Sequence, residues 1–241
     1  MEPTEYHRLA QLAATHWWYV GMRRIARALV RELNLPPGAK ILDAGCGVGS
    51  DLPWLQEFGE PTGFDRHPIA AHYAAAAFPR VARASVLAAP FPSQTFHLVV
   101  SFEVIYHRAV PDDVAALREF ARVLRPGGWL LLRVPAHDWL RGAHDRHVHT
   151  QRRYSIRGLR EKLAQAGLHV RRLTPVGAWL LPVAILRRLI QRSSTIASDV
   201  TAPAPWLNAL LTEVLAAEVL WLRRWDLPFG LSLLALAQAG G

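Results

Sequence analysis

The sequence predicts an α/β protein with a seven-stranded, mostly parallel sheet and helices on both of its faces. Three observations predict it: short apolar runs alternate with helical periodicity, a glycine-rich turn follows the first apolar run, and the second run ends on an acid. Alternation at this spacing favours right-handed crossovers between parallel strands. We expect the final strand to be antiparallel and to follow a helical insertion.

The first half of the chain supplies the opening elements. Helical periodicity fills residues 4–33, and the run Asn34-Leu35-Pro36-Pro37-Gly38 ends it. Pro68 favours a helix start, because its missing N–H costs nothing in the first turn. The run at 95–101 is apolar throughout, as in a central strand. Expected strands cover 40–43, 61–65, 81–84 and 95–101, and expected helices cover 49–58 and 68–77.

The second half continues the alternation. An amphipathic helix over 112–124 stops at Arg125-Pro126-Gly127-Gly128, and a strand over 129–134 follows at once. Gly167 separates a helix over 155–166 from a strand over 168–174. Two apolar helices within 176–226 then precede a last strand over 227–237. We expect one domain over residues 1–241, divided into 1–34, a core over 36–174, an inserted cap over 176–226 and the last strand within 227–241.

Composition is typical of a folded globular protein, with 51% hydrophobic and 20% charged residues. The single cysteine, Cys46, excludes an internal disulfide and fits a reducing compartment. Neither a signal peptide nor a run of about 18 apolar residues is visible. We therefore expect a cytoplasmic protein. The net charge of +9 leaves open a solvated basic face or anionic partners such as acidic lipid head groups, hence a peripheral membrane contact.

The turn at 43–50 is the strongest candidate for a ligand site. Its glycines leave backbone amides bare at a helix start, where a ligand can approach them. Asp65 ends the second strand, the position that holds ribose hydroxyls in nucleoside-binding sheets. Ser50 stands where the dinucleotide fingerprint has its third glycine. Asp43 would repel a pyrophosphate but suits an amino group, so we predict a nucleoside with a non-phosphate tail.

Three further motifs occur in the expected order: Ala89-Pro90-Phe91-Pro92 before a strand, the run 99–107, and Leu124-Arg125-Pro126-Gly127-Gly128. With the glycine turn, they make the chain resemble class I S-adenosylmethionine-dependent methyltransferases of the small-molecule, type 11-like group. The resemblance implies a Rossmann-like sheet and S-adenosyl-L-methionine as the cofactor. It also implies that the segment 1–34 covers the cofactor.

The resemblance assigns a set of cofactor-binding residues. Asp43 and the turn line the methionine part, Asp65 takes the ribose, and Phe64 and Arg66 flank the adenine. Ser85 replaces the family's usual aspartate and accepts more weakly from the adenine amino group. The predicted set is Trp18, Tyr19, Asp43, Gly45, Cys46, Gly47, Phe64, Asp65, Arg66, Ser85, Val86, Ser101 and Phe102. The aromatic run at 16–19 either stacks over a sulfonium or anchors its helix to the core.

Acceptor-side residues are expected on the loops after the fourth and fifth strands, where open α/β sheets bind ligands. A base, if needed, would come from Tyr106, His107 or His144, each of which also fits a structural role. Four residues are candidates for substrate contact: His137, Arg153, Tyr154 and Glu218. Arg153 suits an anionic group, or begins a solvated basic helix. Glu218 interrupts an apolar stripe, so it either meets an arginine or points into the acceptor pocket.

No metal is expected, because the histidines and Asp145 within 137–149 match no metal-binding spacing. Nucleic acid is not the expected partner either. The run Ser101-Phe102-Glu103-Val104 lacks the Asn/Asp-Pro-Pro-aromatic pattern of base-amino methylation, and no cysteine nucleophile lies there. The oligomeric state is left open.

We therefore predict methyl transfer by in-line displacement to a small, hydrophobic or lipid-linked metabolite. One alternative is a non-catalytic cofactor-binding protein that docks on a membrane or partner through 176–226, where residues 181–192 form a basic amphipathic pattern. A cap over the substrate mouth would show the same pattern. The other alternative, an RNA methyltransferase, rests on the net charge alone.

Overall fold

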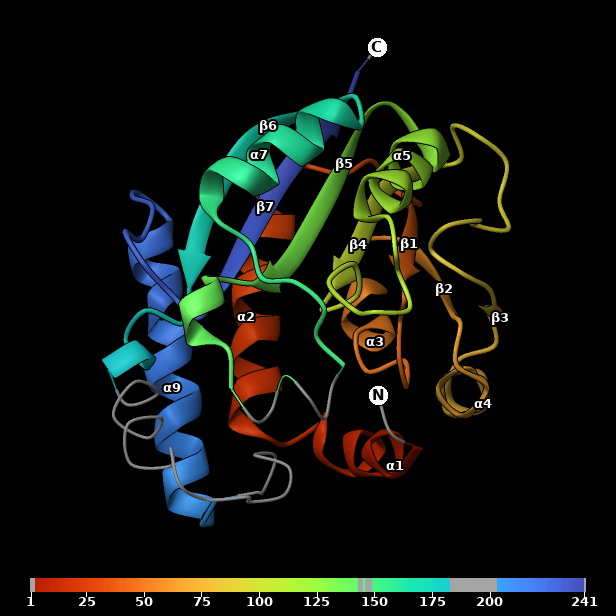
Figure 1. Ribbon diagram of the computed structural model, residues 1–241. Coiled ribbons are helices and arrows are strands. Elements are labelled where there is room, and N and C mark those ends of the chain that lie inside the picture. The colour runs from red at the N-terminus through yellow and green to blue at the C-terminus, as the bar shows by residue number, and fades with distance from the viewer. Residues whose placement is uncertain (1–2, 143–144, 146–148, 183–202, 241) are drawn as a thin grey trace.

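The computed structural model describes residues 3–142, 145, 149–182 and 203–240. Seven strands form one sheet in the order β3-β2-β1-β4-β5-β7-β6 (Figure 1). β7 is antiparallel to β5 and β6, and the other neighbouring pairs are parallel, as predicted. The strands are β1 Lys40–Ala44, β2 Glu60–Asp65, β3 Val81–Arg83, β4 Phe96–Phe102, β5 Leu124–Pro135, β6 Leu168–Val176 and β7 Ser232–Ala239.

Helices pack on both faces of this sheet, because successive strand residues point to opposite sides. Ile41 and Leu98 belong to one buried cluster, with residues of α2, α3 and α9. Leu42 and Val99 belong to the other, with residues of α5 and α7. The helices are α1 Pro3–Leu12, α2 Trp17–Arg31, α3 Leu52–Leu55, α4 Pro68–Ala77, α5 Asp113–Val123, α7 Ile156–Gln165 and α9 Pro205–Leu222, with a short 3₁₀ helix η1 Asp138–Leu140.

Several predicted boundaries were wrong, among them the start of β5, which lies at Leu124 rather than at 129. The stretch 4–33 divides into α1 and α2, because the His16 side chain accepts from the Trp18 N–H and starts a new helix. The helix expected at 49–58 shortens to α3, since Gly49 has a φ of +81°, outside the helical region. The last strand begins at Ser232 rather than 227, because Pro228 lacks the N–H that strand pairing needs.

Within the insertion, α9 packs along α2 (Figure 1). Gly21 permits this contact, because a Cβ there would lie 2.6 Å from Leu215 Cδ2. The buried residues of α9 are Thr212, Leu215, Glu218 and Leu222, so Glu218 lies on the buried side of the helix. The basic amphipathic helix predicted over 181–192 lies almost wholly outside the described residues.

Candidate functional site

The glycine turn lies at the carboxyl end of β1, beside the end of β2. The Gly45 and Cys46 amides both donate to the Phe64 carbonyl oxygen at 2.9 Å, which ties the turn to β2. Gly45 has a φ of +83°, and a Cβ there would lie 2.5 Å from Val104 Cγ2. No larger residue fits, so the turn needs glycine for both conformation and space.

Two acids border the turn. Asp65 Oδ2 accepts from the Gly47 N–H at 3.0 Å, and Asp65 Oδ1 accepts from the His67 N–H at 2.8 Å. Asp43 is only 2% exposed, and its Oδ2 has no hydrogen-bond partner among the described residues. Burial, reinforced by the charges of Asp51 and Asp65, raises the pKa of Asp43 well above its usual range. A buried acid without a counter-charge is costly, so this spot fits a ligand that brings a positive charge.

The cofactor predicted from the sequence satisfies that requirement, because its amino group and sulfonium are cationic. The Leu9 side chain of α1 lies in van der Waals range of the turn. The nearest atom to a Cβ built on Gly47 is Leu9 Cδ2, 3.9 Å away. The Gly45, Cys46 and Gly47 amides are already committed to Phe64 and Asp65. Asp43 and Asp65 are therefore the groups that would hold S-adenosylmethionine.

Helix α1 covers this region through residues that the sequence did not point out. The Tyr6 ring stacks on the His67 ring with centroids 4.1 Å apart. Burial and the charge of Asp65 raise the pKa of Tyr6 to about 12, so the phenol stays protonated. Aromatic residues in a terminal helix carry no distinguishing pattern. Only the general expectation that 1–34 covers the cofactor could have indicated Tyr6.

The predicted cover residues Trp18 and Tyr19 lie on α2 and face different neighbours. Trp18 packs toward the insertion, with Cζ3 3.5 Å from the position of a Cβ on Gly177. Tyr19 lies near Tyr106, on the acceptor side. Trp18 therefore has the anchoring contacts that were the alternative interpretation of this run.

The predicted adenine-side residues are mostly inside the core. Phe64 is fully buried, and its ring lies 6.1 Å from the Phe91 ring. The Arg66 side chain donates to the Ala109 carbonyl oxygen at 3.3 Å. Ser85 Oγ accepts from the Leu87 N–H at 3.2 Å, and Val86 is buried.

The floor of the site is made by β4 and the turn. Ser101 is fully buried, and its hydroxyl donates to the Ala44 carbonyl oxygen at 2.8 Å, which holds the ends of β4 and β1 together. Phe102 lies under the Arg133 guanidinium, 5.0 Å from ring centroid to Cζ. Burial raises the pKa of the Cys46 thiol, so Cys46 is a small packing residue rather than a nucleophile.

The candidate bases lie on the loop after β4, and their surroundings disfavour proton abstraction. Burial and the neighbouring Glu103 raise the pKa of Tyr106 well above its usual range, so Tyr106 can only donate. Burial lowers the pKa of His107 to about 4. His107 is therefore neutral near pH 7, yet its Nδ1 lone pair already accepts from the Ala109 N–H at 3.0 Å. The third candidate, His144, lies outside the described residues.

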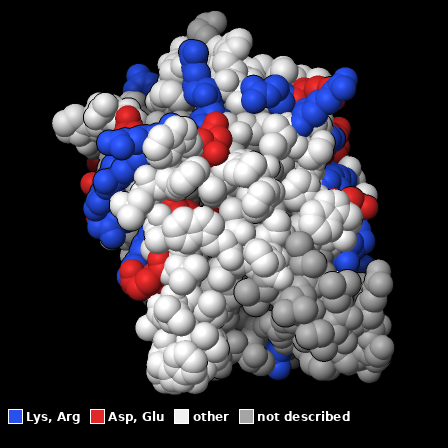
Figure 2. Space-filling model, turned by 90° about the vertical axis from the view of Figure 1, so that its left-hand side faces the viewer, with Lys and Arg blue, Asp and Glu red and all other residues white. Residues whose placement is uncertain are grey.

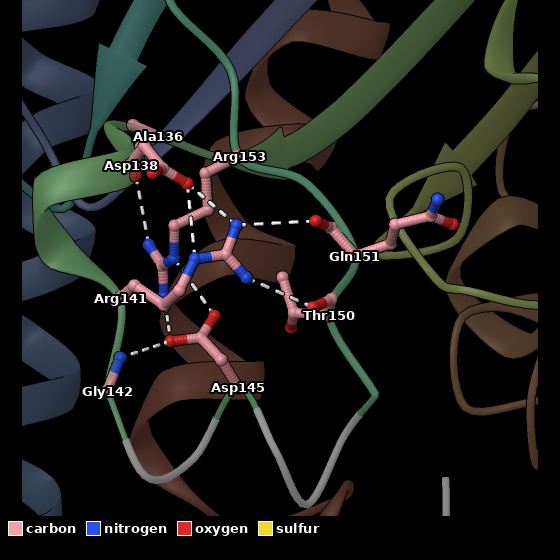
Figure 3. Close-up of polar contacts among 8 residues, drawn as sticks. All are labelled: Ala136, Asp138, Arg141, Gly142, Asp145, Thr150, Gln151 and Arg153. Carbon is pink, nitrogen blue, oxygen red and sulfur yellow. Dashed lines mark hydrogen bonds and ion pairs between the residues drawn. The ribbon is translucent and has the colours of Figure 1, made fainter.

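Arg153 is not the anion clamp that the sequence suggested. Its guanidinium donates to both carboxylate oxygens of Asp145, at 2.9 and 3.2 Å, and to the Ala136 carbonyl oxygen at 2.9 Å (Figure 3). Both side chains of the ion pair are at most 9% exposed. Burial alone would raise the pKa of Asp145, but the hydrogen bonds and charge of Arg153 bring it below its usual value. The pair therefore stabilises the loop after β5.

A second arginine closes the same loop. Arg141 donates to the carbonyl oxygens of Thr150 and Gln151 and to the Asp138 carboxylate (Figure 3). These contacts join the two ends of the segment between η1 and α7. His137, in this loop, has a φ of +52° and stacks on Trp139 with centroids 5.6 Å apart.

Two other substrate candidates have structural partners. The Tyr154 hydroxyl donates to Asp113 Oδ2 at 2.8 Å in a buried contact. Glu218 is fully buried and accepts from the N–H groups of Gly177 at 2.7 Å and Trp179 at 3.1 Å. The expected arginine partner of Glu218 was wrong, because backbone amides take that place. Glu218 thus holds the start of the insertion against α9.

Glu103 is a candidate site residue that was not predicted from the sequence. It follows β4 with a φ of +60°, which is rare for a residue with a side chain and typical of strained functional positions. Its Oε1 accepts from Arg133 Nε at 3.0 Å, and its side chain stays 28% exposed. The one feature of the sequence that could have indicated Glu103 is its position just after the apolar strand predicted over 95–101.

Within the described residues, no group of three His, Cys, Asp or Glu side chains lies close enough to hold a metal ion. The predicted cofactor residues lie mainly at the ends of β1 and β2, which we call the cofactor cradle, and the predicted acceptor residues lie mainly beyond β4 and β5, which we call the acceptor side.

Comparison with known proteins agrees with this geometry. The family model described as "Methyltransferase domain" matches residues 15–173. A probable S-adenosylmethionine-dependent methyltransferase of Mycolicibacterium smegmatis is 29% identical over 221 residues, covering 86% of this chain and 81% of the relative. The 2-methyl-6-phytyl-1,4-hydroquinone methyltransferase of Synechocystis is 29% identical over 195 residues, 73% of this chain but only 58% of that protein.

Among solved structures, the partner of the Trm112 methyltransferase activator in a complex from Haloferax volcanii has the same fold. The two chains superpose with a TM-score of 0.64 at 19% identity, over 98% of each. The family match covers more than half of the chain. The chain therefore belongs to the class I S-adenosylmethionine-dependent methyltransferases.

Proposed function

We propose that the protein methylates a small, hydrophobic or lipid-linked acceptor that binds beside Glu103 and Tyr106. The observation that carries this proposal is the internal pairing of charge on the acceptor side. Arg153 pairs with Asp145, and Arg133 pairs with Glu103. Paired groups offer little to a highly charged substrate, so shape and apolar contact would select the acceptor.

The relatives support this class of acceptor without identifying it. The Synechocystis relative is named for a phytyl hydroquinone, a ring that carries a long apolar chain. The present chain spans a little over half of that protein, so the activity of the relative is a guide and no more.

The division of roles follows from the geometry. S-adenosylmethionine supplies the reactive methyl group, and the protein supplies position and a dry environment. Asp43 and Asp65 would fix the donor. The loop after β5, closed by Arg141 and Arg153, would exclude water from the acceptor side. Glu103, held by Arg133, would orient an acceptor hydroxyl or amine for in-line attack.

The direct test is methyl transfer by the purified full chain, with labelled S-adenosylmethionine and a set of acceptors. The set contains a prenylated hydroquinone, a sterol, a water-soluble catechol and total tRNA. We expect the label in one of the first two. Transfer only to the catechol or to tRNA would contradict the proposal.

The main alternative, binding without turnover, needs a separate measurement. Calorimetry with S-adenosylmethionine, followed by a search for methylated products in a cell extract, distinguishes the two. Tight binding with no methylated product in extract would support the alternative. Because a neighbouring fold is complexed with an activator, the extract also supplies such a partner if one is needed.

A further inference from the structure

The outer side of α9 carries large apolar side chains that the protein core does not use. They recur at helical spacing opposite the buried residues of the same helix. Trp206 is 70% exposed, and Trp221, in the last turn, is 45% exposed. We call this the α9 outer surface, made of Trp206, Leu210, Leu220, Trp221 and Trp225 with the adjoining Arg223 and Arg224.

Figure 2 views the molecule from the side on which α9 lies in Figure 1. Uncharged residues cover most of the described surface there, and basic residues with some acidic ones lie around its upper and lateral edges (Figure 2). Several large apolar side chains exposed on one helix are unusual on a surface that faces water alone.

The charges on this surface are unbalanced toward positive. Glu213, the acid on the outer side of α9, pairs with Arg24 at 2.6 Å. Asp226, just after the helix, pairs with Arg172 at 2.7 Å. In the part of the chain that the structure describes, no acid pairs with Arg223 or Arg224. Both arginines adjoin the exposed tryptophans at the end of the helix.

Tryptophan is the side chain most suited to the boundary between lipid head groups and acyl chains, because its ring is apolar and its N–H is polar. Trp206 stands in the first turn of α9, while Trp221 and Trp225 stand together at its other end, with ring centroids 5.2 Å apart. Such anchors at both ends favour a helix that lies along a membrane surface.

Lying along the membrane fits α9 better than crossing it. By length and composition α9 reaches the threshold for a membrane span. Its inner side, however, packs on α2 and buries Glu218, whose carboxylate is committed to backbone amides. Only the outer side is available to lipid.

We propose that the α9 outer surface docks the protein on an anionic membrane, with the tryptophans in the interface and the arginines on acidic head groups. Asn208, near the Trp206 end, accepts from the Trp17 N–H at 2.9 Å and donates to the Thr15 carbonyl oxygen at 2.8 Å. The docked end is therefore joined to the start of α2, which carries Tyr19 on the acceptor side. This inference stands whether or not the acceptor is a lipid.

The test is flotation of the full chain with vesicles of phosphatidylcholine alone or mixed with phosphatidylglycerol. We expect binding to the mixed vesicles only, weakening as salt is raised. Replacing Arg223 and Arg224 with Gln should weaken binding about fivefold for each arginine. The double variant Trp206→Ser, Trp225→Ser should weaken it about tenfold or more.

Matched variants on α7, on the opposite face of the sheet, provide controls. Arg157→Gln removes an exposed charge, and Ile156→Ser removes an exposed apolar side chain, so neither should change flotation. Thermal unfolding verifies that each variant is folded. The proposal is overturned if the wild type does not float, if the α9 variants float as well as the wild type, or if light scattering shows a dimer that the tryptophan variants dissolve. None of these readouts requires methyl transfer, so failure here leaves the proposed reaction intact.

Discussion

The cofactor cradle and the acceptor side, neighbours on one edge of the sheet, treat buried charge in opposite ways. In the cradle, Asp43 is buried, its Oδ2 has no hydrogen-bond partner in the described part of the chain, and other acids lie nearby. On the acceptor side, Arg153 and Asp145 neutralise one another completely. A buried acid without a partner favours a ligand of opposite charge, whereas a buried ion pair has no charge left for a ligand, which must then be recognised by its shape. The difference teaches that polar residues near a site are not equally available to substrate.

The largest effect, on the free energy of unfolding, is expected at the buried ion pair of Arg153 and Asp145. Arg153→Met leaves the Asp145 carboxylate buried without its partner, so the free energy of unfolding should fall by about 3–5 kcal/mol. Denaturant unfolding measures it. Arg157→Met, at an exposed pair, should stay within about 0.5 kcal/mol of the wild type. Normal stability with a raised acceptor KM would restore Arg153 as a substrate clamp.

The second largest effect is expected at Asp43, the buried acid of the cofactor cradle. Asp43→Asn should weaken S-adenosylmethionine binding by about 100-fold, or about 2.7 kcal/mol. The pKa of Asp43 is raised in the folded protein, so the unfolded chain ionises at a lower pH than the folded one. Asp43 therefore lowers the free energy of unfolding, and this loss grows as the pH rises from about 4 to the pKa of the folded protein. The unliganded variant should therefore unfold at a higher temperature than the wild type near neutral pH. Calorimetry and thermal unfolding check both parts, with Glu60→Gln as an exposed control. Unaltered affinity for the cofactor would refute the assignment of the cradle.

A smaller effect is expected at Glu218, a buried acid with backbone partners. Glu218→Gln keeps one amide-accepting oxygen and loses the second, so stability should fall by about 1–2 kcal/mol with turnover unchanged. Thermal unfolding and steady-state kinetics measure the two separately. Glu213→Gln, on the outer side of the same helix, is the control. Intact stability with lost turnover would place Glu218 in the acceptor pocket instead.

The smallest effect is expected at His107. Its pKa of about 4 means that it is already neutral from pH 5.5 upward, and its lone pair is engaged. His107→Gln should change kcat by less than about threefold. The pH profile of kcat/KM should keep its shape between about pH 5.5 and 8 in both proteins. An inflection that disappears in the variant would identify His107 as the base after all.

The cradle could be predicted from the sequence because its determinants are local. Gly45 and Asp43 stand within one turn, and the end of β2 brings Asp65 beside them whenever the strands are parallel. The order of apolar runs and breaks likewise predicted the mostly parallel sheet. These are features that short-range patterns encode.

The acceptor side could not be predicted in the same way, because its contacts are tertiary. Whether Arg153 faces a substrate or Asp145 depends on how the loop after β5 folds back. Glu218 meets amides of residues 41 and 39 positions away along the chain, a pairing that no spacing rule indicates. The positive φ of Glu103 is not expected for its residue type. It accompanies a tertiary contact, because the Glu103 N–H donates to the Arg133 carbonyl oxygen at the end of β4.

Asn208 carries a practical consequence for redesign. Its side-chain amide accepts from the Trp17 N–H and donates to the Thr15 carbonyl oxygen. These two hydrogen bonds join the N-terminal helices to the insertion near the other end of the chain. In a chimera that took only its first two helices from another protein, Asn208 would lose both of these backbone partners. The insertion would then lose this link to the start of α2. Engineers who wish to change which molecules this enzyme accepts should exchange the two stretches as one module.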